Sequence, residues 1–276
     1  MDSKKWLGAC RKAVMLAVLW VCVYPIFFVW IGSFAGDSEI AGYLRILERD
    51  VGDRWALFPN YMTLKGYVQI LLDTPEFFVA FWNSAKITCA AVTGQLAVNL
   101  PISWWFAQSR CKGKELIYKI YIVLMILPFV VLMLPEYLAL KRFGLLDSLW
   151  SVILPGIFSP FPVFVMVPYM KAVPKTLLEA AELDGAGGMA LFLRIGIPYA
   201  LPGIIVSVIL NFIEYWGSME QILAFVENKA LWPLPLYSLS ITLDKGNVSF
   251  VAAVMAMVIP AYVILLGYHY LEKGWK

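Results

Sequence analysis

Long stretches almost free of charge constrain this chain more than any other feature. Residues 13–35 hold no charged side chain, and as a helix rising about 1.5 Å per residue they would extend roughly 34 Å. That length exceeds the hydrocarbon core of a membrane, which is about 30 Å thick. Five more stretches with at most one charge follow, at residues 77–109, 116–134, 148–170, 195–213 and 246–271.

The backbone of a spanning segment has to satisfy its own polar groups, because the membrane interior offers no water. The six stretches therefore predict an all-α membrane protein with six transmembrane helices. Composition agrees, since 61% of the residues are hydrophobic and only 15% are charged, against about 25% charged in soluble domains. Prolines inside the stretches are expected to form kinks whose freed carbonyls are covered by neighbouring helices.

The distribution of Lys and Arg predicts the orientation, because these residues favour the cytoplasmic side. Six spans place both termini on one side, together with the connectors 110–115 and 171–194, and all four segments are basic. The loop of residues 36–76 instead carries more Asp and Glu than Lys and Arg. Both termini are therefore expected in the cytoplasm.

The N-terminus resembles a signal peptide, but its apolar run is longer than the usual core of about 7–15 residues. It is therefore predicted to be an uncleaved first helix. Three parts are expected: residues 1–35 form a basic tail and the first transmembrane helix, residues 36–76 form an extracytoplasmic loop, and residues 77–276 form a core with five transmembrane helices. The core includes the cytoplasmic loop of residues 171–198.

Several classes of function lack support in the sequence. The net charge of +3, without a run of Lys or Arg, predicts no nucleic-acid partner. The cysteines at positions 10, 22, 89 and 111 form no C-x-x-C pair, and His269 is the only histidine, so no metal site is expected. A Walker A motif, a nucleophile elbow and H-E-x-x-H are absent. The chain is therefore not expected to be an enzyme.

A polar segment with the sequence E-A-A-E-L-D-G at residues 179–185 separates two apolar stretches. Pro174 can open a helix, and Thr176 with Glu179 fits a capping box. Gly185 predicts a helix end in left-handed conformation. A second helix is expected to restart at Met189 and to continue into the next span. The pattern is a short helix, a glycine turn and a helix at the cytoplasmic surface.

The short helix is expected to have an apolar side that rests on another surface and alanines that allow close approach. Its carboxylates could pair with a basic rim, which favours docking into a cleft of another protein. The alternative is a helix lying on lipid, although such helices are usually basic. The predicted apolar side consists of Leu177, Leu178, Ala181 and Leu183, and the carboxylates are Glu179, Glu182 and Asp184.

Polar residues at membrane depth are costly and often line a water-filled path. Such residues cluster at the end of the fifth stretch and are candidates for a substrate pathway; helix–helix hydrogen bonding or an interfacial position is the alternative. In the second stretch, Gln95 and Asn99 are expected to bridge helices. The pathway candidates are Asn211, Glu214, Trp216 and Glu220.

The acidic loop resembles the signature of membrane subunits of type I ATP-binding-cassette importers, which reads E-A-A, three residues, G, nine residues, I-x-L-P. This chain has Glu179-Ala180-Ala181, Gly185 and Ile195-Gly196-Ile197-Pro198, with Ile197 in place of leucine. Over residues 57–276 the chain is similar to the carbohydrate branch, the maltose-type permeases. Trp216-Gly217 departs from the Trp-Asn that is usual in that branch.

The resemblance implies the type I importer permease fold and a helix that docks in a groove of a cytoplasmic ATPase subunit. ATP and Mg²⁺ would be bound by that ATPase dimer, and this chain would hold no cofactor. Further implied partners are a second, non-identical permease subunit, an extracytoplasmic solute-binding protein and membrane lipid. The residues expected to couple to the ATPase are Glu179, Ala180, Ala181, Asp184 and Gly185.

The implied function is import of a sugar or oligosaccharide across a bacterial cytoplasmic (inner) membrane as a multi-pass subunit. Two alternatives stay open. The solute could be a polyol, a glycerol-phosphate or a glycoside, or the chain could be a passive channel or membrane scaffold in which the acidic motif is incidental.

Overall fold

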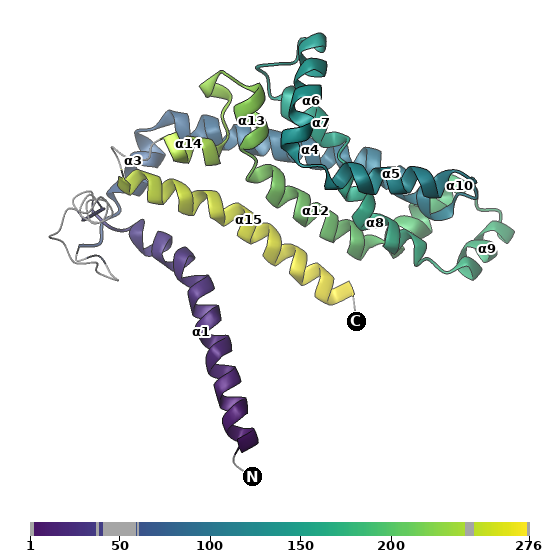
Figure 1. Cartoon of the computed structure of the whole chain (residues 1–276), viewed down its shortest axis with the longest axis horizontal. Coiled ribbons are helices and arrows are strands. Elements are labelled where there is room, and N and C mark those ends of the chain that lie inside the picture. Colours follow the sequence, from purple (N-terminus) through teal and green to yellow (C-terminus); the bar gives the residue numbers. More distant parts are fainter. Residues whose placement is uncertain (1–2, 37–38, 41–58, 60, 241–245, 275–276) are drawn as a thin grey trace. The chain divides into compact units, whose positions relative to one another are not determined.

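The computed structural model describes residues 3–36, 39–40, 59, 61–240 and 246–274 (Figure 1). Regular structure in these ranges is helical, apart from one isolated antiparallel bridge between Ala35 and Met62. The predicted all-α class is therefore confirmed. Most of the predicted loop of residues 36–76 has its central part, residues 41–58, outside the described residues.

The helices follow one another along the chain with short connections. The first half holds α1 (Ser3–Gly32), α3 (Lys65–Leu72), α4 (Pro75–Gln108), α5 (Lys114–Ile126), α6 (Phe129–Phe143), α7 (Trp150–Ile157) and α8 (Phe161–Lys171). The second half holds α9 (Lys175–Leu183), α10 (Gly188–Leu191), a π-helix (Phe192–Gly196), α11 (Ile197–Tyr199), α12 (Leu201–Trp216), α13 (Glu220–Phe225), a 3₁₀ turn (Lys229–Leu231), α14 (Leu234–Ser240) and α15 (Gly246–Gly274).

Within the described ranges, three helical segments are both long and apolar enough to cross a membrane: Arg11–Gly32, Trp150–Lys171 and Val248–Glu272. The count rises to five if each of two bent helix pairs is one span. The sixth predicted stretch forms α4, a helix of 34 residues that carries too many polar side chains to be counted on hydropathy. On α4 the buried polar residues recur mostly at intervals of four and seven, at Ser84, Thr88, Gln95, Asn99 and Ser103.

The chain divides into two compact units. The first comprises residues 1–77 and 237–257, and the second comprises residues 78–236 and 258–276. In the first unit, the Ser33 hydroxyl and the Tyr67 hydroxyl form a hydrogen bond of 2.8 Å. The Thr63 amide also donates to the Phe34 carbonyl at 2.7 Å, so the end of α1 is fastened to the segment before α3.

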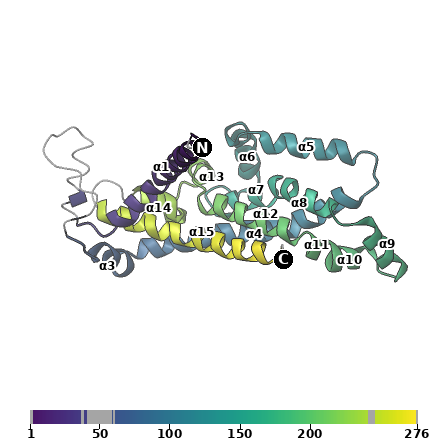
Figure 2. The same cartoon turned by 90° about the horizontal axis from the view of Figure 1, so that it is seen from below.

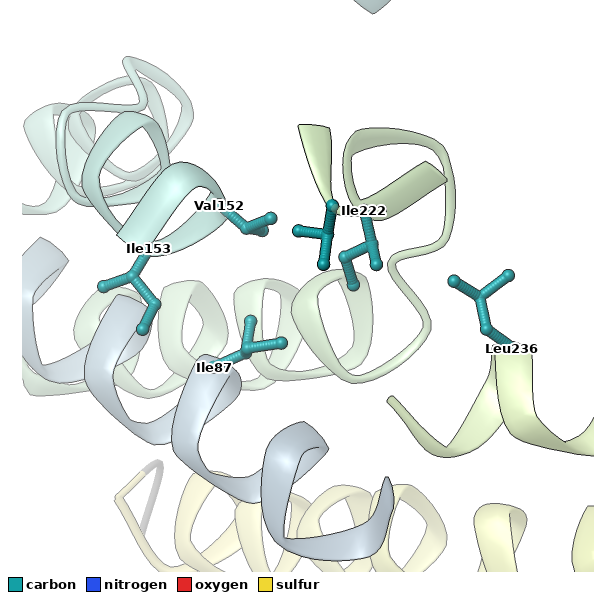
Figure 3. Packing of buried hydrophobic residues seen from close by; sticks show 6 residues of the cluster. Ile87, Val152, Ile153, Ile222 and Leu236 are labelled. Atoms are coloured by element: carbon teal, nitrogen blue, oxygen red, sulfur yellow. The ribbon is translucent and has the colours of Figure 1, made fainter. Parts of the chain in front are cut away.

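The second unit has apolar clusters that join helices distant in the sequence. One consists of the buried side chains of Ile87, Val152, Ile153, Ile222, Val226 and Leu236, most of which are labelled in Figure 3. They come from α4, α7, α13, α14 and the segment after α13, so this cluster fixes α13 against the middle of the unit. A second cluster joins α8 to α12 through Met166, Met170, Phe192, Ala200 and Ile204.

The stretch predicted at residues 116–134 is interrupted, and this corrects the expectation of one continuous helix. α5 and α6 meet at an angle of 101° (Figure 2). Leu127 has extended backbone, with φ −64° and ψ 125°, and Pro128 follows with φ −67° and ψ 147°. A residue before proline is sterically excluded from the helical region, so the chain leaves α5 and restarts as α6.

The break between α7 and α8 shows how this fold satisfies backbone groups that a proline frees. Pro160 cannot donate to the Gly156 carbonyl as a helical residue would. The Gln95 amide of α4 donates to that carbonyl at 2.9 Å, and the Asn99 amide reaches the Ser159 carbonyl at 3.4 Å. The expected bridging by Gln95 and Asn99 is therefore confirmed, and α4 supplies the donors that the break requires.

The helix that restarts after the acidic loop is also bent. It passes from α10 through the π-helix and α11, and then turns by 71° into α12 at Ala200, where the next span was predicted to run on. Pro202 contributes no amide at the second position of α12, where an intrahelical donor is not needed. The next span thus starts at a corner rather than as a straight continuation.

We predict that Gln95→Met lowers the melting temperature of the purified chain in detergent by roughly 2–4 °C, equivalent to about 1 kcal/mol. Methionine keeps the bulk but removes the donor to the Gly156 carbonyl. Thr93→Val on the same helix is the control, because the Thr93 hydroxyl is exposed and donates to its own helix at the Cys89 carbonyl. Equal melting temperatures for the two variants would show that the break needs no donor from α4.

Candidate functional site

The helix α9 begins one residue earlier than the predicted capping box requires. Its N-cap is Pro174, with φ −62° and ψ 130°, and no side chain caps its amides. Thr176 is already the second helical residue, so its hydroxyl cannot take the N-cap role, and the predicted box with Glu179 is wrong. The physical reason is that the fixed φ of proline places the extended-to-helical transition at Pro174 itself. The helix start predicted at Pro174 is correct.

The end of α9 is a Schellman motif centred on Gly185. Gly185 has φ +87°, which is the left-handed conformation that glycine adopts without a Cβ clash. The Ala186 amide donates to the Ala181 carbonyl at 2.9 Å, and the Gly185 amide donates to the Glu182 carbonyl at 3.0 Å. These two bonds satisfy carbonyls that a helix end otherwise leaves open. The predicted glycine stop is confirmed.

The inner face of α9 packs on its own chain. Leu178 forms a buried cluster with Val173 before the helix and Leu191 of α10. Ala181 lies partly buried against this cluster, together with Trp104, Ala186 and Ile195. Ala181 therefore serves the attachment of the helix, and the expectation that both alanines open the backbone to a partner holds for Ala180 only.

The outer face of α9 combines carboxylates with exposed leucines. Glu179, Ala180 and Asp184 are exposed, Leu177 is 44% exposed, and Leu183 is 90% exposed. The predicted apolar side is thus split in two. Residues adjacent in a helix point about 100° apart, so Leu177 and Leu178 cannot share one face. Sequence reasoning grouped Leu183 with the inner residues and missed it as the most exposed leucine of the helix.

The predicted pathway residues do not converge on one point. Asn211 is buried, and its amide donates to the Ser207 carbonyl of its own helix at 2.7 Å. Trp216 is buried, stacks on Phe212 with a ring separation of 5.7 Å and meets Phe81 edge-on. Glu220 is exposed in the first turn of α13. Of the four candidates, Glu214 alone lines the cavity described next.

A cavity of about 590 Å³ lies between α6, the break before α8 and the junction of α12 with α13. Most of its wall is apolar, with Leu132, Phe158 and Phe161 among the lining side chains. Polar groups enter from three directions: Glu136 from α6, Ser159 from the break, and Glu214, Tyr215 and Gln221 from the α12–α13 side. Sequence reasoning missed Glu136 and Gln221, because neither has a local motif and only the bend after α5 brings α6 to this place.

A carboxylate on the loop after α6 fixes α13 against the cavity. The Asp147 Oδ1 accepts hydrogen bonds from the amides of Glu227 at 3.0 Å and Asn228 at 2.8 Å. The Asp147 amide donates back to the Phe225 carbonyl at 2.9 Å, and Asp147 has φ +55°. These bonds tie the loop after α6 to the end of α13, so two walls of the cavity are held together.

Within the described part of the chain no group of His, Cys, Asp and Glu could hold a metal ion. The two features that could carry function are therefore the exposed face of α9 and the cavity. In the second unit, α9 lies at one end and α13 lies toward the other (Figures 1 and 2).

A family model described as "Binding-protein-dependent transport system inner membrane component" matches residues 99–276. The protein LplC of Bacillus subtilis is 28% identical over 223 residues, which cover 81% of this chain and 71% of LplC. The arabinooligosaccharides transport system permease protein AraQ of the same organism is 29% identical over 234 residues, covering 85% of this chain and 80% of AraQ.

Among solved structures, a chain of a bacterial ABC transporter involved in the import of the acidic polysaccharide alginate aligns with a TM-score of 0.81. The alignment covers 99% of this chain and 98% of that chain at 19% identity. The fold is therefore shared along almost the whole length, and the expected type I importer permease fold is confirmed at this level.

We predict that Gly185→Ala strains the end of α9, because an L-residue in left-handed conformation costs about 1 kcal/mol. Hydrogen–deuterium exchange at the Gly185→Ala and Ala186 amides should become roughly fivefold faster, since the Schellman bonds open more often. Gly187→Ala is the control, because Gly187 has φ −75° and open space around a Cβ. Equal exchange rates in both variants would contradict the role given to Gly185.

Proposed function

The chain belongs to the family of binding-protein-dependent transport system inner membrane components, and we propose that it is the sugar-translocating permease subunit of an ATP-driven importer. The observation that carries this proposal is the α9 helix, whose E-A-A-x-x-x-G sequence forms a capped, protruding element with an exposed Leu183. Two relatives support the sugar class, since AraQ and the alginate importer are named for saccharides.

The outer face of α9 would dock into a groove of a cytoplasmic ATPase subunit. Leu183 would fill an apolar pocket, and burying such a side chain contributes about 1.5–3 kcal/mol. Glu179 and Asp184 would flank it and pair with basic residues at the rim, while Ala180 would allow close approach. Ala181 and Gly185 would act indirectly, by attaching and ending the helix. ATP and Mg²⁺ would be bound by the ATPase dimer, and this chain would hold no cofactor.

Motion of α9 would be passed into the membrane through Trp104 of α4. The Trp104 ring packs against the cluster under α9, and it also packs against the cluster around the corner between α11 and α12. Closure of the ATPase dimer would therefore shift α9, α4 and α12 together. Switching of access between the two sides follows if one arrangement binds the closed ATPase dimer better than the other.

The remaining parts of the importer would come from other chains. A second, non-identical permease subunit would complete the pathway, and an extracytoplasmic solute-binding protein would deliver the solute. We place the chain in a bacterial cytoplasmic (inner) membrane as a multi-pass protein with six spans, in which α4 is the span that hydropathy alone does not reveal. The basic termini and α9 would face the cytoplasm, and the loop of residues 36–76 would lie outside.

The pathway would include Glu214, which lines the cavity. Asn211 and Trp216 would support it from inside the helix packing, and Glu220 would lie at its rim. A solute other than a sugar, such as a polyol, a glycerol-phosphate or a glycoside, would use the same architecture.

We predict that Leu183→Asp weakens co-purification of the ATPase subunit with the full importer by roughly tenfold or more, because a charge replaces the apolar anchor. Glu179→Lys should weaken it as well, by reversing the charge at the rim. The exposed Glu115→Lys in the first turn of α5 is the matched control and should leave the complex intact.

Pull-down of the tagged permease, followed by quantification of the bound ATPase, measures these effects. Solute-stimulated ATP hydrolysis in proteoliposomes gives a second reading. If both α9 variants retain full co-purification and transport, the docking role fails and a passive channel or membrane scaffold becomes the better description.

A further inference from the structure

The cavity between α6, α7–α8 and α12–α13 has a charge pattern that restricts its occupant. Glu136 and Glu214 both line it, and they enter from different helices. Among its lining residues, all of which lie in the described part of the chain, there is no Lys, Arg or His. The wall therefore offers negative charge that no basic side chain of the cavity neutralises.

Two acceptor atoms in this wall have no partner among the described residues. The Glu136 Oε2 and the Gln221 Oε1 are both buried and lack a hydrogen bond there. A buried acceptor without a partner costs about 1–3 kcal/mol, so a native site that keeps two of them is suited to a ligand that donates. These two atoms and the Glu214 carboxylate come from α6, α13 and α12, so the acceptors line the cavity from more than one side.

The rest of the wall suits a saccharide. The volume of about 590 Å³ lies within the range of small-molecule sites, which is roughly 300–1,000 Å³. Phe129, Phe143, Phe158 and Phe161 contribute aromatic surface beside the polar groups. Aromatic faces bind apolar patches of a ligand while acceptors take its hydroxyl groups, so the wall fits a solute with many hydroxyl donors.

We propose that this cavity is a passage site that accepts saccharide units bearing hydroxyl or ammonium groups and rejects units bearing carboxylate, phosphate or sulfate. The proposal rests on the proposed function and deepens it by naming the charge class of the solute. An anionic unit would meet two carboxylates and two unpaired acceptors without a compensating cation, and like charges placed together in a site cost several kcal/mol. This chain would then differ from the importer of the acidic polysaccharide alginate, whose fold it shares.

The test measures binding of three trisaccharide probes to the full-length chain in lipid nanodiscs by saturation-transfer NMR titration. The probes are cellotriose, which is neutral, a chitosan trimer, which carries amines, and trigalacturonate, which carries carboxylates. We expect cellotriose and the chitosan trimer to bind and trigalacturonate to bind at least about tenfold more weakly.

The double variant Glu136→Gln and Glu214→Gln should reduce this difference. It should bind the chitosan trimer roughly tenfold more weakly and trigalacturonate more tightly, because both negative charges are gone while the side-chain shape is kept. Gln221→Leu should weaken all three probes alike, since it removes an acceptor without changing charge. Glu115→Gln, an exposed carboxylate outside the cavity, is the control and should change nothing.

The proposal is overturned if trigalacturonate binds the wild-type chain as tightly as cellotriose, if the double variant keeps the wild-type order of affinities, or if none of the probes binds. Each of these outcomes leaves the co-purification result for Leu183→Asp unaffected. Loss of the charge selectivity and loss of the importer role are therefore distinguished by separate measurements.

Discussion

Satisfying the backbone where helices break is the constraint on which the rest of this structure depends. A chain this apolar has to bond its own amides and carbonyls, yet its spans are interrupted at Pro128, before Pro160 and at Ala200. α4 resolves part of this conflict, because its Gln95 and Asn99 donate to carbonyls at the break between α7 and α8. The polar stripe that lowers the hydropathy of α4 is thus the reason why the neighbouring helix can break.

The break also creates the cavity. Because α6 leaves α5 at 101°, it faces α12 and α13 instead of continuing along the direction of α5. Glu136 then shares a wall with Glu214 and Gln221, which are far from it in sequence. The bonds from Asp147 to the end of α13 hold two sides of this wall together. Local backbone chemistry at Pro128 therefore determines which polar groups meet.

The sequence predicted the helical class, the bridging role of Gln95 and Asn99, and the helix, glycine turn and helix of the acidic loop. These features depend on local composition, spacing and the chemistry of proline and glycine. It could not predict the angle at Pro128, because proline permits a range of bends and packing selects one. It also misassigned Leu177 and Leu183, since the buried face of a short helix depends on the surface beneath it, here Val173 and Leu191. The cavity residues Glu136 and Gln221 were missed because their proximity is tertiary.

The capping of α9 has one further consequence. Its start is set by Pro174, its end by the Gly185 motif, and its orientation by Leu178 in the underlying cluster. All three come from the chain itself, so the helix is pre-organised before any partner arrives. A partner that binds it spends little free energy on ordering the loop, and most of the contact energy remains available for association. Such a connector can detach and re-engage repeatedly while keeping its shape, as a rigid lever does and a folding-upon-binding segment does not.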